Sequence, residues 1–248
     1  MNKSAVILAG GEGKRMKSDK PKPMSEVLGK PMLGWVIDSV RKAGVENICV
    51  VTGYHKEYIE DYVKTFDFPI ETVFQSERLG TGHAVMMAKD FLKKNSGDVV
   101  ILCGDAPFMD CKTVSDSYKL HDEKGAYATV ITAKLENPSG YGRIVRNDDG
   151  TLNSIVEQKD ADEETLKINE VNSGGYWFDS IGLLSVLDKI TSNNNAKEYY
   201  LPDALSLLLS DGKTIEAYIS ENEDAVLGAN DPQQLEELNN LAIKKGYK

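Results

Sequence analysis

Cysteine and histidine are both scarce in this sequence of 248 residues, with three of each. The cysteines are Cys49, Cys103 and Cys111, an odd number without metal-site spacing, and the first two lie in apolar runs typical of strands. Buried, reduced thiols are the expected state of such residues, so we predict neither a disulfide nor a zinc site. The three histidines have no partners that suggest a Ser-His-Asp triad.

Long hydrophobic runs are absent as well. No apolar run approaches the roughly 20 residues needed to cross a bilayer. The N-terminal run 5–9 is too short for a signal peptide and lacks a small-residue cleavage pattern. Low-complexity tracts and repeats of fixed period are also missing. The sequence therefore predicts a cytoplasmic protein with no membrane partner.

Basic residues are fewer than acidic ones. The chain has 29 Lys and Arg and 39 Asp and Glu, which give a net charge of −10. Duplex binding requires a broad basic surface, so we do not expect nucleic acid as a partner. One segment departs from this balance. Its basic residues are Lys14, Arg15, Lys17, Lys20 and Lys22, with Asp19 as the one acid among them. Such a segment suits a small phosphorylated ligand, although composition alone favours a solvated charged loop.

The first half of the chain alternates strand-like and helix-like segments. Strands are predicted over residues 4–8, 47–52, 70–74 and 98–103, and helices over residues 32–43, 54–64 and 83–94. This rhythm predicts an α/β fold with a Rossmann-like, doubly wound sheet that is mixed but mostly parallel. Ligands of such sheets bind beyond the carboxyl ends of the strands. The loops after Leu8, Phe74 and Cys103 are therefore the expected site.

The pattern changes after about residue 126. Strands are predicted over 128–133 and 171–178, a hairpin over 143–156 with an Asp149-Gly150 turn, and helices over 181–190, 201–209 and after Asp231-Pro232. No linker separates the halves, so we predict a single domain, 1–248, whose second half adds a substrate-facing layer to the first.

A glycine-rich segment, Leu8-Ala9-Gly10-Gly11-Glu12-Gly13-Lys14-Arg15-Met16, follows the first strand directly. Its glycines allow the backbone to approach a ligand and to present N–H groups to phosphate oxygens. Met16 occupies the place of the third glycine of a dinucleotide fingerprint, and Arg15 follows Gly13-Lys14 where a P-loop has Ser or Thr. The pattern favours a phosphate-binding loop of another kind over a plain glycine turn.

Three further segments carry candidate chemistry. In Lys20-Pro21-Lys22-Pro23 the prolines fix the backbone and hold Lys22 in a defined direction, unless the segment is an exposed connector. In the segment 75–84, Gln75 and Gly80-Thr81-Gly82 offer donors and acceptors to a base edge, unless Thr81 only caps a helix. Asp105, after an apolar strand, suits Mg²⁺ beside a triphosphate, unless it only starts a turn.

Taken in order, these motifs resemble the uridyltransferase domain of the bacterial bifunctional N-acetylglucosamine-1-phosphate uridyltransferases. The resemblance runs from about residue 5 to 240 and includes Gly140-Tyr141-Gly142-Arg143-Ile144, Ile155-Val156-Glu157-Gln158-Lys159-Asp160, Glu170-Val171-Asn172-Ser173-Gly174, Glu198-Tyr199-Tyr200-Leu201-Pro202-Asp203 and Gly228-Ala229-Asn230. It implies a nucleotide-diphospho-sugar transferase fold with a nucleotide-binding half (about 1–125), an added sugar-binding β layer (about 126–230) and a C-terminal helix (231–248).

The resemblance also implies a role for each matching residue. Arg15 and Lys22 would be catalytic cations, and Asp105 and Asn230 would hold Mg²⁺. The expected nucleotide-binding residues are Leu8, Ala9, Gly10, Gly11, Gln75, Gly80 and Thr81. The expected sugar-binding residues are Gly142, Glu157, Asn172 and Tyr199.

The implied reaction transfers a uridylyl group from UTP to N-acetylglucosamine 1-phosphate, giving UDP-N-acetylglucosamine and pyrophosphate by Mg²⁺-assisted in-line attack. The family usually has Ala at Gly10 and Thr at Lys14, and many members have Gln at Arg78. No hexapeptide repeat of the acetyltransferase domain is present, so no left-handed β-helix is expected. The sequence leaves open another sugar 1-phosphate or nucleoside triphosphate, a non-catalytic nucleotide-sugar-binding regulatory subunit, and a homo-oligomer.

Overall fold

A computed structural model describes residues 2–247 of the chain. The strands are β1 (Lys3–Leu8), β2 (Glu26–Val27), β3 (Lys30–Pro31), β4 (Asn47–Thr52), β5 (Ile70–Phe74), β6 (Asp98–Cys103), β7 (Ala128–Lys134), β8 (Arg143–Arg146), β9 (Leu152–Val156), β10 (Glu170–Asp179) and β11 (Ile215–Ile219). The α-helices are α1 (Met32–Lys42), α2 (Lys56–Val63), α3 (Thr81–Met87), α4 (Lys89–Lys94), α5 (Cys111–Glu123), α6 (Glu163–Leu166), α7 (Ser180–Leu187), α8 (Asp203–Ser210) and α9 (Pro232–Lys245). Short 3-10 helices are η1 (Lys14–Met16), η2 (Lys22–Met24) and η3 (Glu223–Val226).

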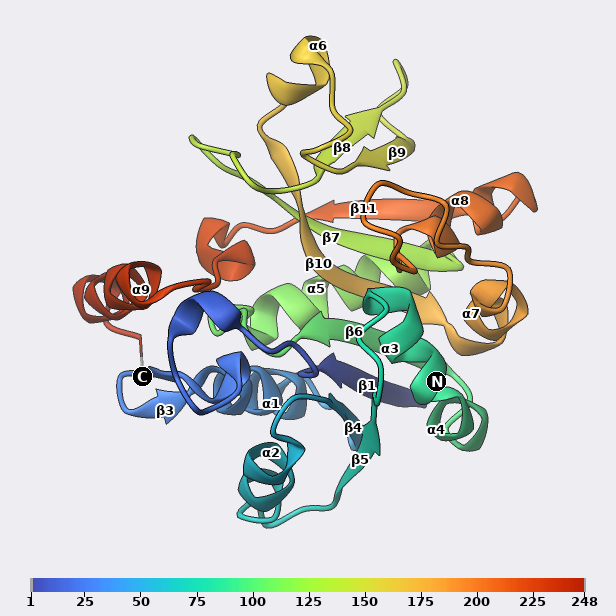
Figure 1. Cartoon of the computed structure of the whole chain (residues 1–248). Coiled ribbons are helices and arrows are strands. Elements are labelled where there is room, and N and C mark those ends of the chain that lie inside the picture. The colour runs from blue at the N-terminus through green and yellow to red at the C-terminus, as the bar shows by residue number, and fades with distance from the viewer. Residues whose placement is uncertain (1, 248) are drawn as a thin grey trace.

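One nine-stranded sheet runs through the chain, with its main path in the order β11-β7-β10-β6-β1-β4-β5. The strands β6, β1, β4 and β5 pair in parallel, as do β11 and β7. Strand β10 runs antiparallel to both of its neighbours, β6 and β7. The predicted α/β class with a mixed, mostly parallel, doubly wound sheet is confirmed (Figure 1).

The central strands are apolar throughout because helices cover both faces of the sheet. In β1, Val6 packs into a core shared with α3, α4, α7 and α8. Its neighbours Ala5 and Ile7 point the other way, into a core shared with α1, α2 and α5. This alternation is the two-residue period of an extended strand. Burial on both faces makes the central sheet a rigid base for the loops at its carboxyl edge.

The hairpin β8–β9 and helix α6 rise from the end of the sheet near β10 (Figure 1). The hairpin turn is closed by hydrogen bonds from Asn147 N to Thr151 O (2.9 Å) and from Gly150 N to Asn147 O (2.9 Å). Gly150 has φ +84°, which explains why glycine follows Asp149 there. The predicted hairpin is confirmed.

Helix α9 begins where the Asp231-Pro232 signal places it. The Asp231 side chain accepts a hydrogen bond from Gln234 N at 2.9 Å, and Gly246 ends the helix with φ +70°. Leu238 and Ala242 bury against Val27 and Phe108, so the helix packs against the β2–β3 hairpin. None of the helices within residues 2–247 is long and apolar enough to cross a membrane.

The structure differs from the prediction in several elements. The predicted helix 83–94 is two helices, α3 and α4, separated at Ala88, where no glycine or proline signals a break. The short elements β2, β3 and α6 were not predicted, and neither were α5 and β11. Helix α5 is mostly polar, and β11 is short and half-buried, so neither shows a strong apolar period.

Candidate active site

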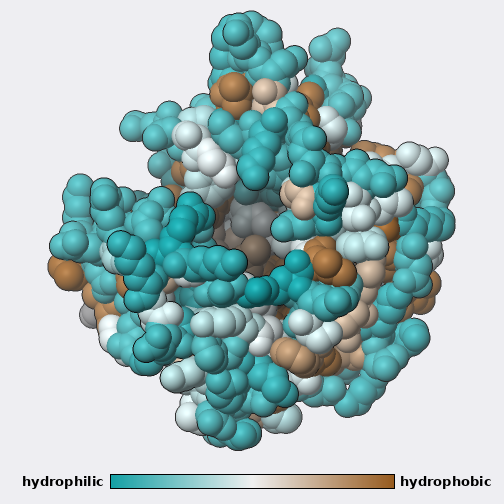
Figure 2. Space-filling model, viewed as in Figure 1, coloured by the Kyte–Doolittle hydropathy of each residue, from teal (hydrophilic) through white to brown (hydrophobic). Residues whose placement is uncertain are grey.

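The loops after β1, β5 and β6 meet at the carboxyl edge of the sheet. Backbone hydrogen bonds join the positions where these loops leave their strands. Gly104 N donates to Leu8 O (2.9 Å), Ala9 N to Val51 O (2.9 Å) and Gln75 N to Thr52 O (2.9 Å). The space-filling view shows a recess with a hydrophilic rim near the centre of this face (Figure 2). Two adjoining hollows open at this edge, and Lys22, Cys103 and Asp105 line both.

The glycine-rich loop packs closely against its neighbours at two positions. A Cβ added to Gly13, which has φ +62°, would lie 2.6 Å from Lys22 Cβ. A Cβ added to Gly10 would lie 2.9 Å from Gln75 Oε1. The glycines therefore bring residues 10–16 against both the lysine segment and the Gln75 loop. Gly10 and Gly11 line one of the two hollows, called the first hollow below. Arg15 lines the second hollow.

Lys22 is held at the junction of the two hollows. Pro21 precedes η2, and Pro23 and Met24 inside it are buried, so the segment is anchored rather than an exposed connector. The ammonium lies 2.5 Å from Asp105 Oδ2 and donates to Asn230 Oδ1 at 2.7 Å. Its side chain is 15% exposed. Lys22 thus connects three loops that are far apart in the sequence.

The two candidate magnesium ligands, Asp105 and Asn230, lie close enough together to bind one cation between them. Their side-chain oxygens both contact the Lys22 ammonium, which is the kind of charge that a metal ion would supply. Within residues 2–247 there is no cluster of three or more His, Cys, Asp or Glu side chains suited to a metal. Magnesium in nucleotide sites is usually held by one or two carboxylates with phosphate oxygens and water. The oxygen pair fits that pattern.

Gln75 and the Gly80-Thr81 backbone form the other end of the first hollow. Gln75 is 6% exposed, and its Nε2 donates to Gly80 O (3.1 Å) and to His83 Nδ1 (3.1 Å). Thr81 Oγ1 accepts from Leu201 N at 3.0 Å and makes no capping bond to α3. The structure therefore does not support the alternative in which Thr81 only caps a helix.

Tyr199 supports this loop through its backbone. Its carbonyl accepts from Gly82 N (2.7 Å), and its N–H donates to Leu79 O (2.7 Å). A Cβ on Gly80, which has φ +104°, would lie 2.6 Å from Tyr199 O. The Tyr199 ring packs against the apolar core beside His83, at 6.2 Å between centroids. These contacts place Tyr199 at the Gly80 loop, whereas the resemblance implied a sugar-binding role for it.

Gly142, Glu157 and Asn172 come together at the added β layer. A Cβ on Gly142 would lie 3.3 Å from Glu157 Oε1, and Asn172 N donates to Gly142 O at 2.9 Å. Burial, followed by repulsion from Asp160 and Asp203, raises the pKa of the Glu157 carboxyl. The environment of Glu157 thus disfavours the charged form of its carboxyl group. Such perturbed pKa values are common at functional sites.

Three residues of this layer were not found from the sequence. Tyr176 is buried and accepts a hydrogen bond from Asn172 Nδ2 at 2.7 Å. Burial, followed by the nearby charges of Glu198 and Glu157, raises the pKa of the Tyr200 phenol. The buried Arg143 donates to Tyr141 O and to Gln158 Oε1, and so supports the backbone beside Gly142. The Glu-Tyr-Tyr motif alone cannot distinguish Tyr200 from Tyr199.

Cys103 lines both hollows but is unsuited to covalent catalysis. Burial, followed by the charge of Asp105, raises the pKa of its thiol to about 12. A cysteine nucleophile reacts as the thiolate, which this environment disfavours. The candidate chemistry therefore depends on fixed cations and acceptors rather than on a covalent intermediate.

An ion pair lies beside the first hollow, which Arg78 lines. The Arg78 guanidinium pairs with the Glu12 carboxylate, and Lys14 Nζ lies 3.7 Å from the same carboxylate. Arg78 and Lys14 are the two basic departures from the resembled family. Glu12 therefore offsets the charge that both departures add.

The comparisons with known proteins agree with this architecture. Residues 4–225 match the family model described as nucleotidyl transferase. The bifunctional protein GlmU of Clostridium beijerinckii is 47% identical over 237 residues, which is 96% of this chain and 51% of that protein. GlmU of Acetivibrio thermocellus is 46% identical over 233 residues, 94% of this chain and 50% of that protein. The chain spans about half the length of these curated relatives.

Solved structures share the fold at low identity. A crystal structure of UDP-glucose pyrophosphorylase complexed with UDP-glucose has a TM-score of 0.81 at 19% identity, covering 99% of this chain and 100% of that one. A putative glucose-1-phosphate thymidylyltransferase from Bacillus anthracis has a TM-score of 0.79 at 19% identity, covering 97% of this chain and 95% of that one.

Proposed function

Since the chain belongs to the nucleotidyl transferase family, we propose that it transfers the uridylyl group of UTP to N-acetylglucosamine 1-phosphate and releases pyrophosphate. The observation that carries the proposal is the meeting of Lys22, Asp105 and Asn230 beside the glycine-rich loop. Two anions must approach one another in this reaction, and this is where the chain concentrates positive charge and metal-ligand oxygens. The 47% identity to a GlmU protein supports the choice of uridine and N-acetylglucosamine.

The attacking group would be the phosphate of the sugar 1-phosphate. A phosphate monoester has a second pKa near 6 and is largely a dianion at neutral pH. The nucleophile is therefore already ionised and requires no general base. This accounts for a site that contains cations and amides but no serine or cysteine nucleophile with a paired base.

The bond changes would occur at the α-phosphorus of UTP. One oxygen of the sugar phosphate forms a bond to that phosphorus while the bond to the β-phosphate oxygen breaks, and the electron pair leaves with pyrophosphate. Lys22 and Arg15 would offset the negative charge on the reacting and leaving phosphates. Asp105 and Asn230 would hold Mg²⁺, which supplies further neutralisation when bound. Catalysis would consist of positioning and charge neutralisation.

The substrates would be held by groups on both sides of this centre. The backbone of Leu8, Ala9, Gly10 and Gly11 would follow the nucleotide, and Gln75 with Gly80-Thr81 would contact the uracil edge. Gly142, Glu157 and Asn172 would hold the sugar, with the Glu157 carboxylate accepting from a hydroxyl. Tyr199 would support the Gly80 loop through its backbone and contribute to the sugar side as the resemblance implies, and Tyr200, whose pKa the Glu198 and Glu157 charges raise further, would lie near it.

Two other functions compete with this one. The same transfer with another sugar or base would use the same cations, and a non-catalytic regulatory subunit would retain the fold without turnover. Lys22 held by Asp105 and Asn230 favours an active enzyme, since mere ligand binding does not require a shared cation site.

A substrate panel tests the proposal. Four nucleoside triphosphates are combined with N-acetylglucosamine, N-acetylgalactosamine and glucose 1-phosphates, with and without Mg²⁺, and pyrophosphate release is measured. The highest kcat/KM is expected for UTP with N-acetylglucosamine 1-phosphate in Mg²⁺, and Asp105→Asn should weaken the Mg²⁺ dependence. Preference for another pair, or no release from any pair, would refute the proposal.

A further inference from the structure

The two candidate metal ligands lie on separate loops whose spacing must be held by other contacts. Asp105 follows β6, and Asn230 lies between η3 and α9. The loops touch at Gly228, where an added Cβ would lie 2.7 Å from Asp105 O. A small shift of either loop would therefore change the distance between the two ligand oxygens.

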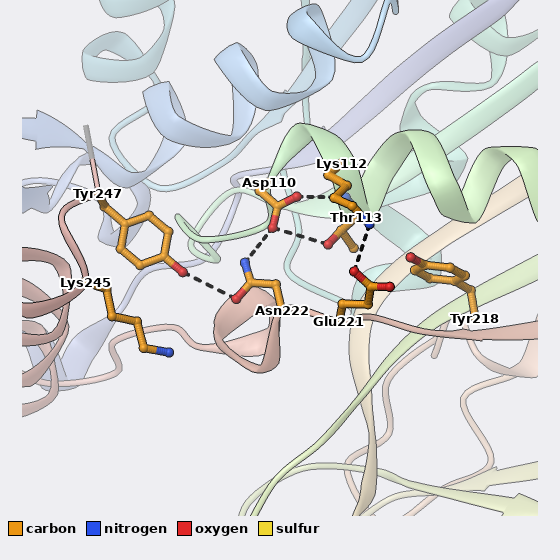
Figure 3. A pocket seen from close by; sticks show the side chains of 8 residues that line it. All are labelled: Asp110, Lys112, Thr113, Tyr218, Glu221, Asn222, Lys245 and Tyr247. Atoms are coloured by element: carbon orange, nitrogen blue, oxygen red, sulfur yellow. Dashed lines mark hydrogen bonds and ion pairs between the residues drawn. The ribbon is translucent and has the colours of Figure 1, made fainter.

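Asn222 joins these two loops from behind the site. Its Nδ2 donates to Phe108 O (3.0 Å) and to Asp110 Oδ2 (2.6 Å), both on the Asp105 loop. Its Oδ1 accepts from Asp224 N (3.0 Å), at the start of η3 and on the Asn230 side. Figure 3 shows Asn222 between Asp110 and Tyr247 at the edge of a polar pocket that the mechanism does not use.

The end of the chain closes this arrangement. The Tyr247 hydroxyl donates to Asp224 Oδ2 (2.9 Å) and lies 3.3 Å from Asn222 Oδ1. Its ring stacks on Phe108, with centroids 4.4 Å apart and planes at 19°. Lys245 Nζ donates to the same Asp224 carboxylate at 2.6 Å, and Asp224 is only 5% exposed. Tyr247 therefore contacts both loops at once.

We propose that Tyr247, acting through Asp224 and Asn222, is a positioning residue that sets the spacing of Asp105 and Asn230 for a divalent cation. The inference rests on the proposed metal role of those two residues and adds a control of metal affinity from the C-terminal turn. Groups that orient metal ligands from outside commonly change metal affinity without touching the metal. Tyr247 lines neither of the two hollows at the sheet edge, so its effect is expected in the metal dependence.

This contact is separable from the stability of the fold. Helix α9 is anchored by the burial of Leu238 and Ala242 and by the Asn239 side chain, which accepts from Leu28 N at 2.8 Å. Loss of the Tyr247 hydroxyl leaves these contacts and the stack on Phe108 in place. Tyr247→Phe should therefore fold, with a Tm lowered only by the loss of its hydrogen bond to Asp224.

The test compares Tyr247→Phe with Tyr218→Phe. Tyr218 lines the same pocket, and its hydroxyl makes no hydrogen bond within residues 2–247, so it is a matched control (Figure 3). Binding of Mn²⁺ in the presence of UTP is measured by electron paramagnetic resonance, and the Mg²⁺ dependence of pyrophosphate release is measured separately. Tyr247→Phe should weaken Mn²⁺ binding and raise the half-saturating Mg²⁺ about tenfold, the lower end of the range for partners that orient metal ligands. The kcat at saturating Mg²⁺ should stay unchanged, and the protein should remain folded at the assay temperature.

A second variant, Asp224→Asn, should shift the metal dependence in the same direction and by more, because it removes the negative charge that holds Lys245 and leaves one acceptor oxygen for the two donors Tyr247 and Lys245. Equal Mn²⁺ affinities for Tyr247→Phe and the unaltered protein would overturn the inference. A shift of the same size in Tyr218→Phe, or a fall in Tm without a change in metal affinity, would also overturn it. Because the Mn²⁺ titration needs no turnover, failure of the substrate panel refutes the proposed function separately.

Discussion

Removing the Lys22 ammonium should have two opposite effects. The change Lys22→Met keeps the aliphatic stem and deletes the charge that contacts Asp105 Oδ2 at 2.5 Å and Asn230 Oδ1 at 2.7 Å. Without nucleotide, a metal ion must displace this ammonium to reach the two oxygens. With nucleotide, Lys22 would serve the phosphates. The variant should therefore bind metal more tightly and turn over more slowly.

The expected change in metal affinity follows from the burial of the Lys22–Asp105 ion pair. A charge-assisted hydrogen bond contributes about 1.5–3 kcal/mol. The Lys22 and Asp105 side chains are 15% and 28% exposed, so solvent screens part of this interaction. A net value of about 1–2 kcal/mol corresponds to metal binding about 5- to 30-fold tighter. Loss of one cation aimed at the transition state costs about 3 kcal/mol, or about a hundredfold in kcat.

The assay titrates Mn²⁺ without nucleotide and measures pyrophosphate release at saturating Mg²⁺. Lys20→Met is a matched control, because Lys20 lies in the same segment, is 51% exposed and only approaches Glu26 at 3.9 Å. It should leave the metal affinity and kcat unchanged. If Lys22→Met binds Mn²⁺ no more tightly than the unaltered protein, or keeps near-normal turnover, the shared cation site is refuted.

Three further variants test the nucleotide and sugar sides of the site. Burial raises the pKa of Glu157, so its carboxylate is protonated at a higher pH than that of an exposed glutamate. On acidification, the KM for the sugar phosphate should therefore begin to rise at this higher pH. Glu157→Gln should have a high KM that lacks this transition and keeps only the pH dependence due to the phosphate of the substrate, whose second pKa is near 6. A transition at the same pH as in the unaltered protein would contradict this. Gly80→Ala, at φ +104°, should cost about 1–3 kcal/mol, seen as a lower Tm, and should raise the KM for UTP. An unchanged Tm would argue against the close contact with Tyr199. Glu12→Gln should free Arg78 and lower the KM for UTP a few-fold at low salt. The same change in an Arg78→Gln background should have a smaller effect, because only the looser contact of Glu12 with Lys14 remains, so an equal effect there would exclude the Arg78–Glu12 ion pair as the cause.

Local signals in the sequence were sufficient for most of the sheet. The predicted strands 47–52 and 98–103 coincide with β4 and β6, because buried parallel strands are continuous apolar runs ended by glycine or polar residues. The predicted strand 70–74 coincides with β5, an exposed edge strand of alternating character. The start of α9 followed from Asp231-Pro232 for a similar reason, since capping is a local hydrogen bond. Helix α5 and strand β11 escaped prediction because they are half-exposed and owe their stability to contacts with the rest of the fold.

The sequence by itself determined which chemical groups each loop carries: glycines and cations after β1, an amide after β5, a carboxylate after β6. Only the tertiary structure decided which of them meet. Lys22 and Asn230 are 208 residues apart and share a hydrogen bond, and the Tyr199 backbone pairs with that of Leu79 and Gly82. Capping and strand formation depend on neighbouring residues, whereas contacts between distant loops depend on how the whole sheet and its helices pack.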